Sequence, residues 1–376
     1  MKWETVRLGD VLDYEQPTKY IIQNTDYCDS FKTPVLTAGQ SFILGYTNEN
    51  NNVFTENLPV IIFDDFTTAI KYVDFPFKVK SSAMKILKAQ KDINIKYLYY
   101  YMSTISVDTE LHKRYWISQY SNIKISLPPI NIQNETVNVL NRVNSLIEKR
   151  KEQIAVLDLL IRSQFINMFG DPVTNPMGWE VISLRESSLR ISDGPFGSNL
   201  KTEHYTDSGV RVVRLGNIGV SEFIDYDKAF ISVEHYETLK KYTCLPNDII
   251  IGTLGEPNLR ACILPNYIKK AINKSDCVHY KPNRDIANTY FVCEYLNQPA
   301  VLSIAGGSIH GQTRSRISMS QVAALPIFIP PLTLQNRFAD FAQQVDKLKI
   351  EMQQGLNKLE MLNKSLMQKC FNGEVL

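Results

Sequence analysis

The sequence lacks the long apolar segments of a membrane protein and the leader of a secreted one. No apolar run approaches the roughly 18 residues that a membrane-spanning helix needs, and the first ten residues, MKWETVRLGD, are too polar for a secretion signal. Hydrophobic residues make up 44% of the chain, which is typical of a globular protein. We therefore expect a cytoplasmic protein without a membrane partner, whose 376 residues suit two or three domains.

Paired cysteines and a strong net charge are also missing. The six cysteines include no CxxC pair and have no histidine-rich neighbourhood, so neither a disulfide framework nor a zinc site is predicted. All six are expected to be buried thiols. The net charge of +2 does not indicate a nucleic-acid binder. It does not exclude one either, because a basic patch can lie within a nearly balanced total.

Catalytic motifs are absent as well. The proline pairs at 128–129 and 330–331 follow Leu127 and Ile329, so neither belongs to the N-P-P-[YF] signature of methyltransferases. No GxxxxGK[ST] motif of a nucleotide-driven motor occurs. Asp248 and Glu256 have no catalytic lysine near them, and the histidines have no evident nucleophile. The sequence therefore predicts a protein that is not an enzyme.

What the sequence does contain is a long internal repeat. SLPPINIQN (126–134) recurs as FIPPLTLQN (328–336), at a separation of 202 residues (330 − 128 = 202) that continues to the end of the chain. The start of each half is marked by a Trp-Glu pair, at 3–4 and 179–180. Each half is therefore a variable globular segment followed by a constant tail. The predicted regions are globular segments at 1–125 and 175–325, a helix with its linker at 126–174, and a C-terminal helix at 326–376.

Both tails carry an apolar stripe with heptad spacing, and each proline pair is predicted to lie just before a long helix. The stripe of the first tail runs through Leu140, Ile147, Ile154 and Ile161. Polar residues interrupt the two stripes at different places, so we expect the helices to pack on each other as an antiparallel coiled coil, with a length of roughly 55 Å. The alternative is that each helix only covers its own globular segment.

The globular segments have the patterns of mixed α/β domains. Aliphatic runs predict buried strands at 58–63 and 246–251, with helices packed on them at 95–104 and 287–296. The expected fold class is α+β. Two mixed α/β domains are joined by two long antiparallel helices that form a coiled coil, as a pseudo-twofold tandem repeat.

Candidate DNA contacts lie where glycines and basic residues follow predicted strands. PVLTAGQ (34–40) and RVVRLGN (211–217) both end in glycine and an amide side chain, Gln40 and Asn217, which suits adenine, while Arg214 within the second motif suits guanine. DGPFGSNLKT (193–202) suits a loop close to phosphates, and GGSIHGQTRSRIS (306–318) combines glycines with basic residues and no acid. Ordinary turns and solvated surface loops are the alternatives.

The predicted DNA-contacting residues come from both halves. In the first half they are Thr37, Gly39, Gln40, Lys71, Lys80, Ser81, Ser82, Lys113 and Arg114. In the second half they are Gly194, Phe196, Gly197, Ser198, Asn199, Lys201, Arg211, Arg214, Asn217, Lys274, His310, Gln312, Arg314 and Arg316. The basic patch LHKRYW (111–116) has interleaved aromatic residues, for which a charged helix face is the alternative.

These motifs resemble the specificity subunits of type I restriction-modification enzymes over essentially the whole chain. MFGDPVTNPMGWE (168–180) resembles the junction between their halves, and ISDGPFGSNLKTEHY with VRVVRLGNI resembles the opening of one recognition domain. ALPIFIPPLTLQNRF resembles the entry to their conserved helix, and TAGQSFILGYT with VIIFDDFTTAIKYVDFPF a second recognition-domain type. The first half has DYEQPTKYII (13–22) in place of GPFG, so the role of that loop does not carry over.

The resemblance implies a non-catalytic DNA-reading subunit. Each recognition domain would read one half of a bipartite site in double-stranded DNA, and the helix pair would set the gap between the halves. The implied partners are two modification subunits, which methylate adenine, and restriction subunits with translocase and nuclease activity. No cofactor is expected in this chain, whereas S-adenosylmethionine, ATP and Mg²⁺ are expected on the partners. The residues leave open a self-contained restriction or methylation enzyme and a coiled-coil scaffold that binds only protein.

Overall fold

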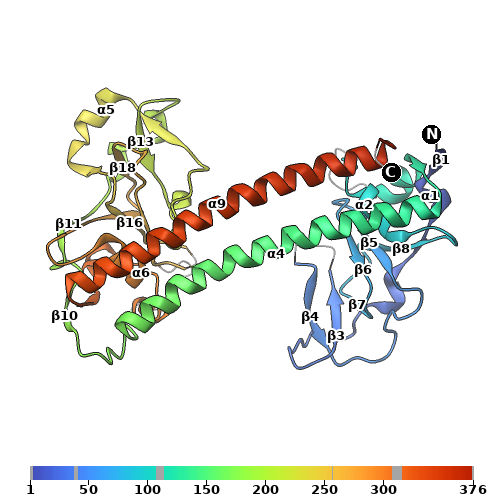
Figure 1. Ribbon diagram of the computed structural model, residues 1–376, viewed down its shortest axis with the longest axis horizontal. Coiled ribbons are helices and arrows are strands. Elements are labelled where there is room, and N and C mark those ends of the chain that lie inside the picture. The colour runs from blue at the N-terminus through green and yellow to red at the C-terminus, as the bar shows by residue number, and fades with distance from the viewer. Residues whose placement is uncertain (1–2, 38–40, 107–113, 256, 307–315, 375–376) are drawn as a thin grey trace. The chain divides into compact units, whose positions relative to one another are not determined.

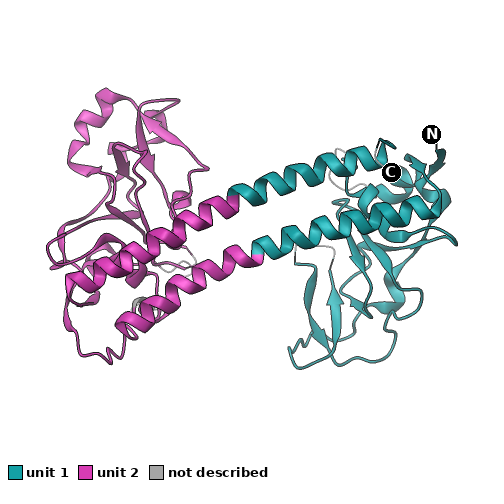
Figure 2. Cartoon of the chain, in the orientation of Figure 1, with its two compact units in different colours: residues 1–151, 354–376 teal, residues 152–353 magenta. Residues whose placement is uncertain are grey.

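The structure of the chain is a computed structural model (Figure 1), which describes residues 3–37, 41–106, 114–255, 257–306 and 316–374. It divides into two compact units (Figure 2), one formed by residues 1–151 and 354–376 and the other by residues 152–353. Each unit combines one globular segment with parts of two long helices. Within the described ranges, no helix is both long enough and apolar enough to cross a membrane.

Unit 1 contains two sheets and a separate strand pair. The first sheet has the order β2-β8-β5-β6 and the second the order β4-β3-β7. Its strands are β1 (Glu4–Arg7), β2 (Leu12–Glu15), β3 (Thr33–Leu36), β4 (Ile43–Thr47), β5 (Val60–Asp64), β6 (Ile70–Val73), β7 (Lys78–Val79), β8 (Met84–Ala89) and β9 (Lys124–Leu127), with β1 paired to β9. Its short helices are α1 (Leu8–Val11), η1 (Pro17–Tyr20), α2 (Ile95–Met102), α3 (Tyr115–Ser118) and η2 (Tyr120–Asn122).

Unit 2 repeats this plan with additions. Its sheets have the orders β11-β19-β16-β17 and β12-β14-β13-β18-β15, and β10 pairs with β20. The strands are β10 (Glu180–Ser183), β11 (Ser188–Asp193), β12 (Tyr205–Thr206), β13 (Val210–Val213), β14 (Ala229–Ile231), β15 (Thr243–Cys244), β16 (Ile249–Gly252), β17 (Arg260–Ile263), β18 (Ala271–Asn273), β19 (Cys277–Pro282) and β20 (Pro326–Ile329). The short helices are η3 (Gly197–Asn199), η4 (Thr202–His204), η5 (Leu215–Asn217), α5 (Val233–Thr238), η6 (Lys240–Tyr242), α6 (Thr289–Leu296), α7 (Pro299–Gly306) and α8 (Met319–Ala324).

The two globular segments share one topology. In both, a four-stranded antiparallel sheet is accompanied by a second sheet, three-stranded in unit 1 and five-stranded in unit 2. The second sheet contains a parallel strand pair, β3 with β7 in unit 1 and β13 with β18 in unit 2. The predicted buried strands correspond to β5 and β16, and the predicted helices to α2 and α6, so these four predictions are confirmed. The longer second half accommodates two further strands, β12 and β15, at the edges of this second sheet.

The two long helices begin where the proline pairs predict. Helix α4 (Ile130–Phe169) starts directly after Pro129, and α9 (Leu332–Phe371) directly after Pro331. The residues of the predicted stripe of α4, Leu140, Ile147, Ile154 and Ile161, are at most 9% exposed. The heptad pattern therefore identifies the buried face of the helix, because apolar side chains seven residues apart return to the same side.

Polar contacts connect the two long helices inside each unit. In unit 1, Asn363 Nδ2 donates to Asn144 Oδ1 (2.9 Å), and Lys151 lies 3.7 Å from Glu360. Residue numbers thus rise along α4 as they fall along α9, so these parts of the helices run antiparallel. In unit 2, Lys349 Nζ lies 2.8 Å from Asp158 Oδ1.

The Gln-Asn pair of the repeat explains how each long helix is joined to its globular segment. Gln133 is 2% exposed; its Oε1 accepts from the backbone N–H of Asn94 (2.9 Å), and its Nε2 donates to Pro128 O (2.8 Å). Asn94 is the N-cap of α2, and its Nδ2 donates to Asn134 Oδ1 (2.7 Å). The side chain of Gln133 therefore ties the start of α4 to the start of α2.

Unit 2 repeats these bonds with different residues. Gln335 is fully buried and accepts from the N–H of Asn288 (2.8 Å), the N-cap of α6, while it donates to Pro330 O (2.8 Å). Asn288 Nδ2 donates to Asn336 Oδ1 (2.8 Å). We call the arrangement around Gln133 and around Gln335 the glutamine anchor.

A buried carboxyl group lies on α6, which packs on β17 of the four-stranded sheet of unit 2. Glu294 accepts hydrogen bonds from Ser221 Oγ (3.0 Å) and Gln298 Nε2 (2.9 Å). Burial raises the pKa of Glu294 to about 7, against the partly compensating bond from Ser221. Burial also raises the pKa of Asp346 on α9 to about 6. Glu294 thus holds the turn at Ser221 against α6 in a form that binds a proton near neutral pH.

The cysteines require one correction. Five are buried, as predicted, but Cys28 is exposed. It lies in the segment before β3, where Cys28 Sγ is 3.0 Å from Ser30 Oγ.

Replacement of Gln133 by alanine tests the glutamine anchor. The change leaves the N–H of Asn94 and the carbonyl of Pro128 without their partner, so we expect unit 1 to lose about 2–4 kcal/mol of unfolding free energy. Urea denaturation of the full chain measures this loss. Gln368→Ala, at an exposed position of α9 in the same unit, should change stability by less than about 0.5 kcal/mol. If Gln133→Ala lost no more unfolding free energy than Gln368→Ala, the glutamine anchor would not be important for stability.

Replacement of Glu294 by glutamine tests the buried carboxyl group. The folded state binds a proton more tightly than the unfolded state between the ordinary pKa of 4.5 and about 7, so stability falls as pH rises through this window. Glu294→Gln should remove roughly 2 kcal/mol of the loss between pH 5 and pH 8.5. Thermal melting at several pH values measures it. Glu237→Gln, at an exposed carboxylate of α5, is the control, and an unchanged pH profile in Glu294→Gln contradicts the assignment.

Candidate nucleic-acid interface

The parallel strand pair places a lysine at the same position in both units. Lys80 directly follows β7, and its backbone N–H donates to Leu36 O at the end of β3 (2.8 Å). Lys274 directly follows β18, and its N–H donates to Val213 O at the end of β13 (2.9 Å). Both predicted residues therefore lie at the carboxyl end of a parallel pair, where side chains from neighbouring segments converge.

An arginine also occupies equivalent positions, 202 residues apart (316 − 114 = 202). Arg114 precedes Tyr115, whose N–H donates to the carbonyl of Asp65, just after β5 (3.0 Å). Arg316 precedes Ile317, whose N–H donates to the carbonyl of Thr253, just after β16 (3.0 Å). Both arginine side chains are exposed. Each unit therefore positions one lysine and one arginine by the same backbone bonds.

In unit 1 the remaining described candidates surround Lys80. The N–H of Thr37 donates to Phe42 O (3.0 Å), and Lys71 Nζ lies 5.8 Å from the centroid of the Phe42 ring. Ser81 and Ser82 are exposed beside Lys80. The structure thus brings candidates from three segments to one edge. Gly39, Gln40 and Lys113 lie outside the described residues.

The aromatic residues of the predicted basic patch at 111–116 belong to the core instead. Tyr115 is fully buried, and Trp116 is 1% exposed and packs edge-to-face on Phe63 at 5.5 Å. Neither ring is therefore accessible to DNA. Alternating basic and aromatic residues arise here because α3 closes one side of the hydrophobic core.

In unit 2 the glycine-rich loop lies against the strand that leads to Lys274. A Cβ atom at Gly194 would lie 2.1 Å from the carbonyl oxygen of Asn273, so only glycine fits this close approach. Phe196, Gly197, Ser198 and Asn199 are exposed beyond it, as is Lys201, which lies 3.4 Å from Glu203. Burial raises the pKa of Asp193 at the start of the loop, although Arg316 opposes the shift. Loop, Lys274 and Arg316 therefore share one edge.

Two histidines hold this loop to α5, a contact that the sequence did not predict. His235 Nε2 is 2.9 Å from the carbonyl oxygen of Asn199. The ring centroids of His204 and His235 are 4.1 Å apart. The exposed part of the loop is therefore fixed at both of its ends.

Two predicted contacts of unit 2 have structural roles in this geometry. Asn217 is fully buried, and its amide donates to the carbonyls of Ile224 and Asp227 (both 3.0 Å) and accepts from the N–H of Arg214 (3.0 Å). Arg211 is 5% exposed and pairs with Asp225 at 2.9 Å. Neither side chain is accessible to a base, so the geometry gives no support to their predicted DNA contacts.

Arg214 has a different environment from Arg211. Its guanidinium Nη2 is paired with Asp227, and its Cζ lies 5.8 Å from the centroid of the Tyr205 ring. The side chain is 30% exposed, and the neighbouring Tyr226 is 93% exposed. Sequence reasoning missed Tyr205, Tyr226 and Asp227. The alternation Asp-Tyr-Asp-Lys at 225–228 is the only signal that the sequence offered for them.

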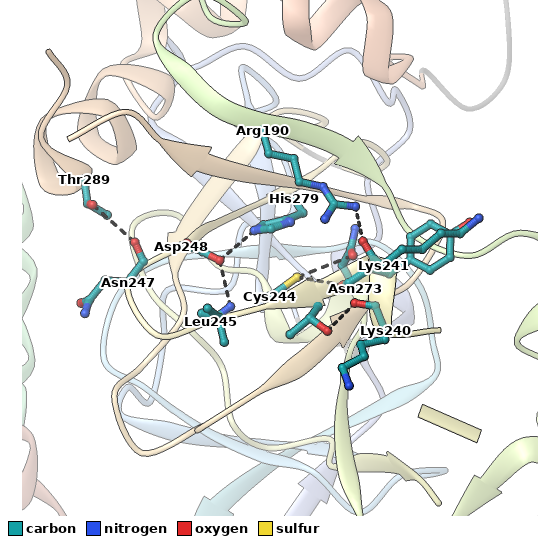
Figure 3. Close-up of polar contacts among 12 residues, drawn as sticks. Arg190, Lys240, Lys241, Cys244, Leu245, Asn247, Asp248, Asn273, His279 and Thr289 are labelled. Carbon is teal, nitrogen blue, oxygen red and sulfur yellow. Dashed lines mark hydrogen bonds and ion pairs between the residues drawn. The ribbon is translucent and has the colours of Figure 1, made fainter. Parts of the chain in front are cut away.

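A buried polar cluster supports this edge of unit 2 (Figure 3). Asp248 accepts from the N–H of Leu245 and from His279 Nε2, both at 2.8 Å. Asn273 Nδ2 donates to Cys277 O (2.6 Å), which closes the turn that carries Lys274. The position of the lysine backbone is therefore set by groups in the interior of the unit. His310, Gln312 and Arg314 lie outside the described residues.

Comparison with known proteins agrees with this organisation. The family model described as "Type I restriction modification DNA specificity domain" matches residues 1–157 and 197–361. The specificity subunit of the type I restriction enzyme EcoR124I/EcoR124II from Escherichia coli is 31% identical over 369 residues, which cover 94% of this chain and 89% of the relative. The MjaVIII specificity subunit from Methanocaldococcus jannaschii is 19% identical over 407 residues, or 99% of this chain and 93% of the relative.

Solved structures share the fold. The S subunit of a type I restriction-modification system from M. genitalium has a TM-score of 0.55 at 14% identity and covers 98% of this chain and 96% of its own. A chain from a study of the assembly and conformational transition of a type I system has a TM-score of 0.57 at 18% identity, with 100% and 98% covered. Together with the two matched domains, these findings show that the chain belongs to the specificity subunits of type I restriction-modification systems, which are non-catalytic DNA-recognition components.

Proposed function

We propose that each unit of this subunit reads one half of a bipartite site in double-stranded DNA, through the edge that carries the lysine and arginine. The observation that supports this is the duplication of Lys80 with Arg114 and of Lys274 with Arg316 by identical backbone bonds. One lysine and one arginine recur at equivalent positions in both units. Such a repeated pair suits contacts with phosphates, which position a protein on the duplex whatever its base sequence. The residues that differ between the units then specify the bases.

The first unit contributes Thr37, Lys71, Ser81 and Ser82 to this proposed surface, and Gly39, Gln40 and Lys113 remain sequence-based candidates for it. The second unit contributes the loop at 194–201 together with Arg214. His310, Gln312 and Arg314 remain candidates because they lie next to Arg316 in the sequence. Some of these side chains can donate hydrogen bonds to phosphates, and others can pair with the edges of bases.

The long helices serve as the spacer in this proposal, paired as an antiparallel coiled coil. The contacts of Asn144 with Asn363, Lys151 with Glu360 and Asp158 with Lys349 support such pairing. A helix of 40 residues is about 60 Å long. Since one turn of DNA is about 34–36 Å, a spacer of this length suits two half-sites separated by between one and two turns.

The helices also provide the proposed docking surface for two modification subunits. On the part of α4 in unit 2, Val156, Leu159, Leu160 and Ile166 are between 39% and 58% exposed. Apolar side chains at helical spacing suit the apolar face of a partner helix. We place restriction subunits in the same complex, and S-adenosylmethionine, ATP and Mg²⁺ on these partners, with the complex in the cytoplasm where DNA lies.

Exchange of one recognition domain tests the division of labour. Co-expression of the chain with a modification subunit, followed by mapping of methylated adenines, should give a two-part motif. Replacement of residues 175–325 by the corresponding segment of another specificity subunit should change the second part alone. A single continuous motif would contradict the proposal, as would a change in both parts. A scaffold that binds only protein would give no sequence preference.

Removal of the duplicated lysines tests the phosphate role. Lys80→Ala and Lys274→Ala should each weaken DNA binding by a similar factor on all sequences and lower the slope of log affinity against log salt by about 1. Fluorescence anisotropy of the assembled methyltransferase at several salt concentrations measures both quantities. Lys269→Ala, an exposed lysine before β18, is the matched control. A changed motif with an unchanged salt slope would assign these lysines to base readout instead.

A further inference from the structure

We propose that Asp227 is a positioning residue that sets the specificity of unit 2 by holding Arg214 in one orientation toward a guanine. The inference rests on the proposed function, because it assigns a role within the DNA-facing edge of that unit. It adds a residue that does not itself contact DNA. The argument depends on how the backbone of Asp227 is fixed, on which nitrogen of Arg214 it occupies, and on which nitrogens remain.

The backbone at Asp227 is fixed by groups from the interior. Strands β13 and β14 are antiparallel, with Val212 opposite Ala229, so the chain after β13 and the chain before β14 bring Arg214 and Asp227 together. The carbonyl of Asp227 accepts from Asn217 Nδ2 (3.0 Å) and from Arg211 Nη2 (3.3 Å). Both donors are buried side chains. The carboxylate of Asp227 therefore starts from a rigid backbone position.

The guanidinium of Arg214 is held on one side only. Asp227 pairs with Nη2, and the Tyr205 ring lies beside the guanidinium carbon at 5.8 Å. The adjacent Nε is buried and has no hydrogen-bond partner among the described residues. A ligand thus cannot use the side that presents Nε and Nη2 together. Among the described residues Nη1 has no partner and the side chain is 30% exposed, so the end of the group that carries Nη1 remains available.

This free end suits guanine. Two parallel N–H donors match the O6 and N7 acceptors that guanine presents in the major groove. A free arginine side chain loses rotamer entropy when it is fixed, whereas a side chain that is already held loses less on binding. If Asp227 masked Arg214, it would be expected to occupy two nitrogens in a bidentate pair. Only the contact to Nη2 is found, which favours positioning over masking.

The test uses the assembled methyltransferase and duplexes that carry the methylation motif of the wild-type complex. Each base pair of the second half-site is varied in turn, and affinities are measured by fluorescence anisotropy. Arg214→Ala should relax one base pair of that half. Asp227→Asn, which removes the charge but keeps the shape, should lower discrimination at the same base pair by about 10-fold. Discrimination in the first half should not change.

A double-mutant comparison separates positioning from a general structural effect. In the Arg214→Ala background, Asp227→Asn should cause no further loss of discrimination, because its effect acts through the arginine. Glu237→Gln, which removes an exposed carboxylate in the same unit, is the matched control and should leave discrimination unchanged. Equal thermal melting of the variant complexes verifies folding. The Asp227 side chain is half exposed, so its replacement is expected to leave the fold intact.

Three outcomes would overturn the inference. Asp227→Asn could leave discrimination at the wild-type level, or it could raise affinity for all duplexes equally, which would make Asp227 an inhibitor of binding. Arg214→Ala could also relax no base pair. In each case the wild-type complex would still methylate a two-part motif. The absence of such a motif in the wild type would instead reject the proposed function itself.

Discussion

The glutamine anchor is the constraint on which the arrangement of each unit depends. A helix of 40 residues can space two domains only if each domain is fixed to it. Gln133 and Gln335 provide that fixation, because a single buried side chain satisfies both the first amide of a domain helix and the carbonyl of the proline pair. A buried donor or acceptor left unpaired costs about 1–3 kcal/mol, so a loosened joint is strongly disfavoured. The repeated Pro-Pro and Gln-Asn motifs are therefore parts of one joint.

The two units use one scaffold to present different surfaces. The parallel strand pair, the lysine after it and the arginine beside the central sheet recur in both, whereas the loop at 194–201 and the segment at 224–228 belong to the second unit. Phosphates are the same along any duplex, so residues that contact them can be duplicated without loss. Base contacts must differ if the halves of the site differ. This division accounts for the combination of a repeated framework with unequal loops.

The sequence predicted the framework better than the interface. Proline pairs, heptad spacing and aliphatic runs are local signals, and they located α4, α9, β5 and β16. The roles of Arg211 and Asn217 depend on residues ten to sixteen positions away, with which they form buried contacts, and no local pattern reveals that burial. The burial of Trp116 was hidden for the same reason, since its neighbours in the sequence resemble a basic surface while its ring belongs to the core. The structural equivalence of Arg114 and Arg316 became evident only from the backbone hydrogen bonds beside them in the two units.

The central proposal is that the anchored helices act as a spacer of fixed length between the two recognition domains. Spin labels on cysteines introduced at the exposed positions Lys91 and Lys269, in a Cys28→Ser chain, allow pulsed electron paramagnetic resonance to measure that distance in solution. The account predicts one narrow distance distribution in the wild-type background and a broad one when Gln133 and Gln335 are both replaced by alanine. A broad distribution in the wild type, or one that the double replacement leaves unchanged, would contradict it.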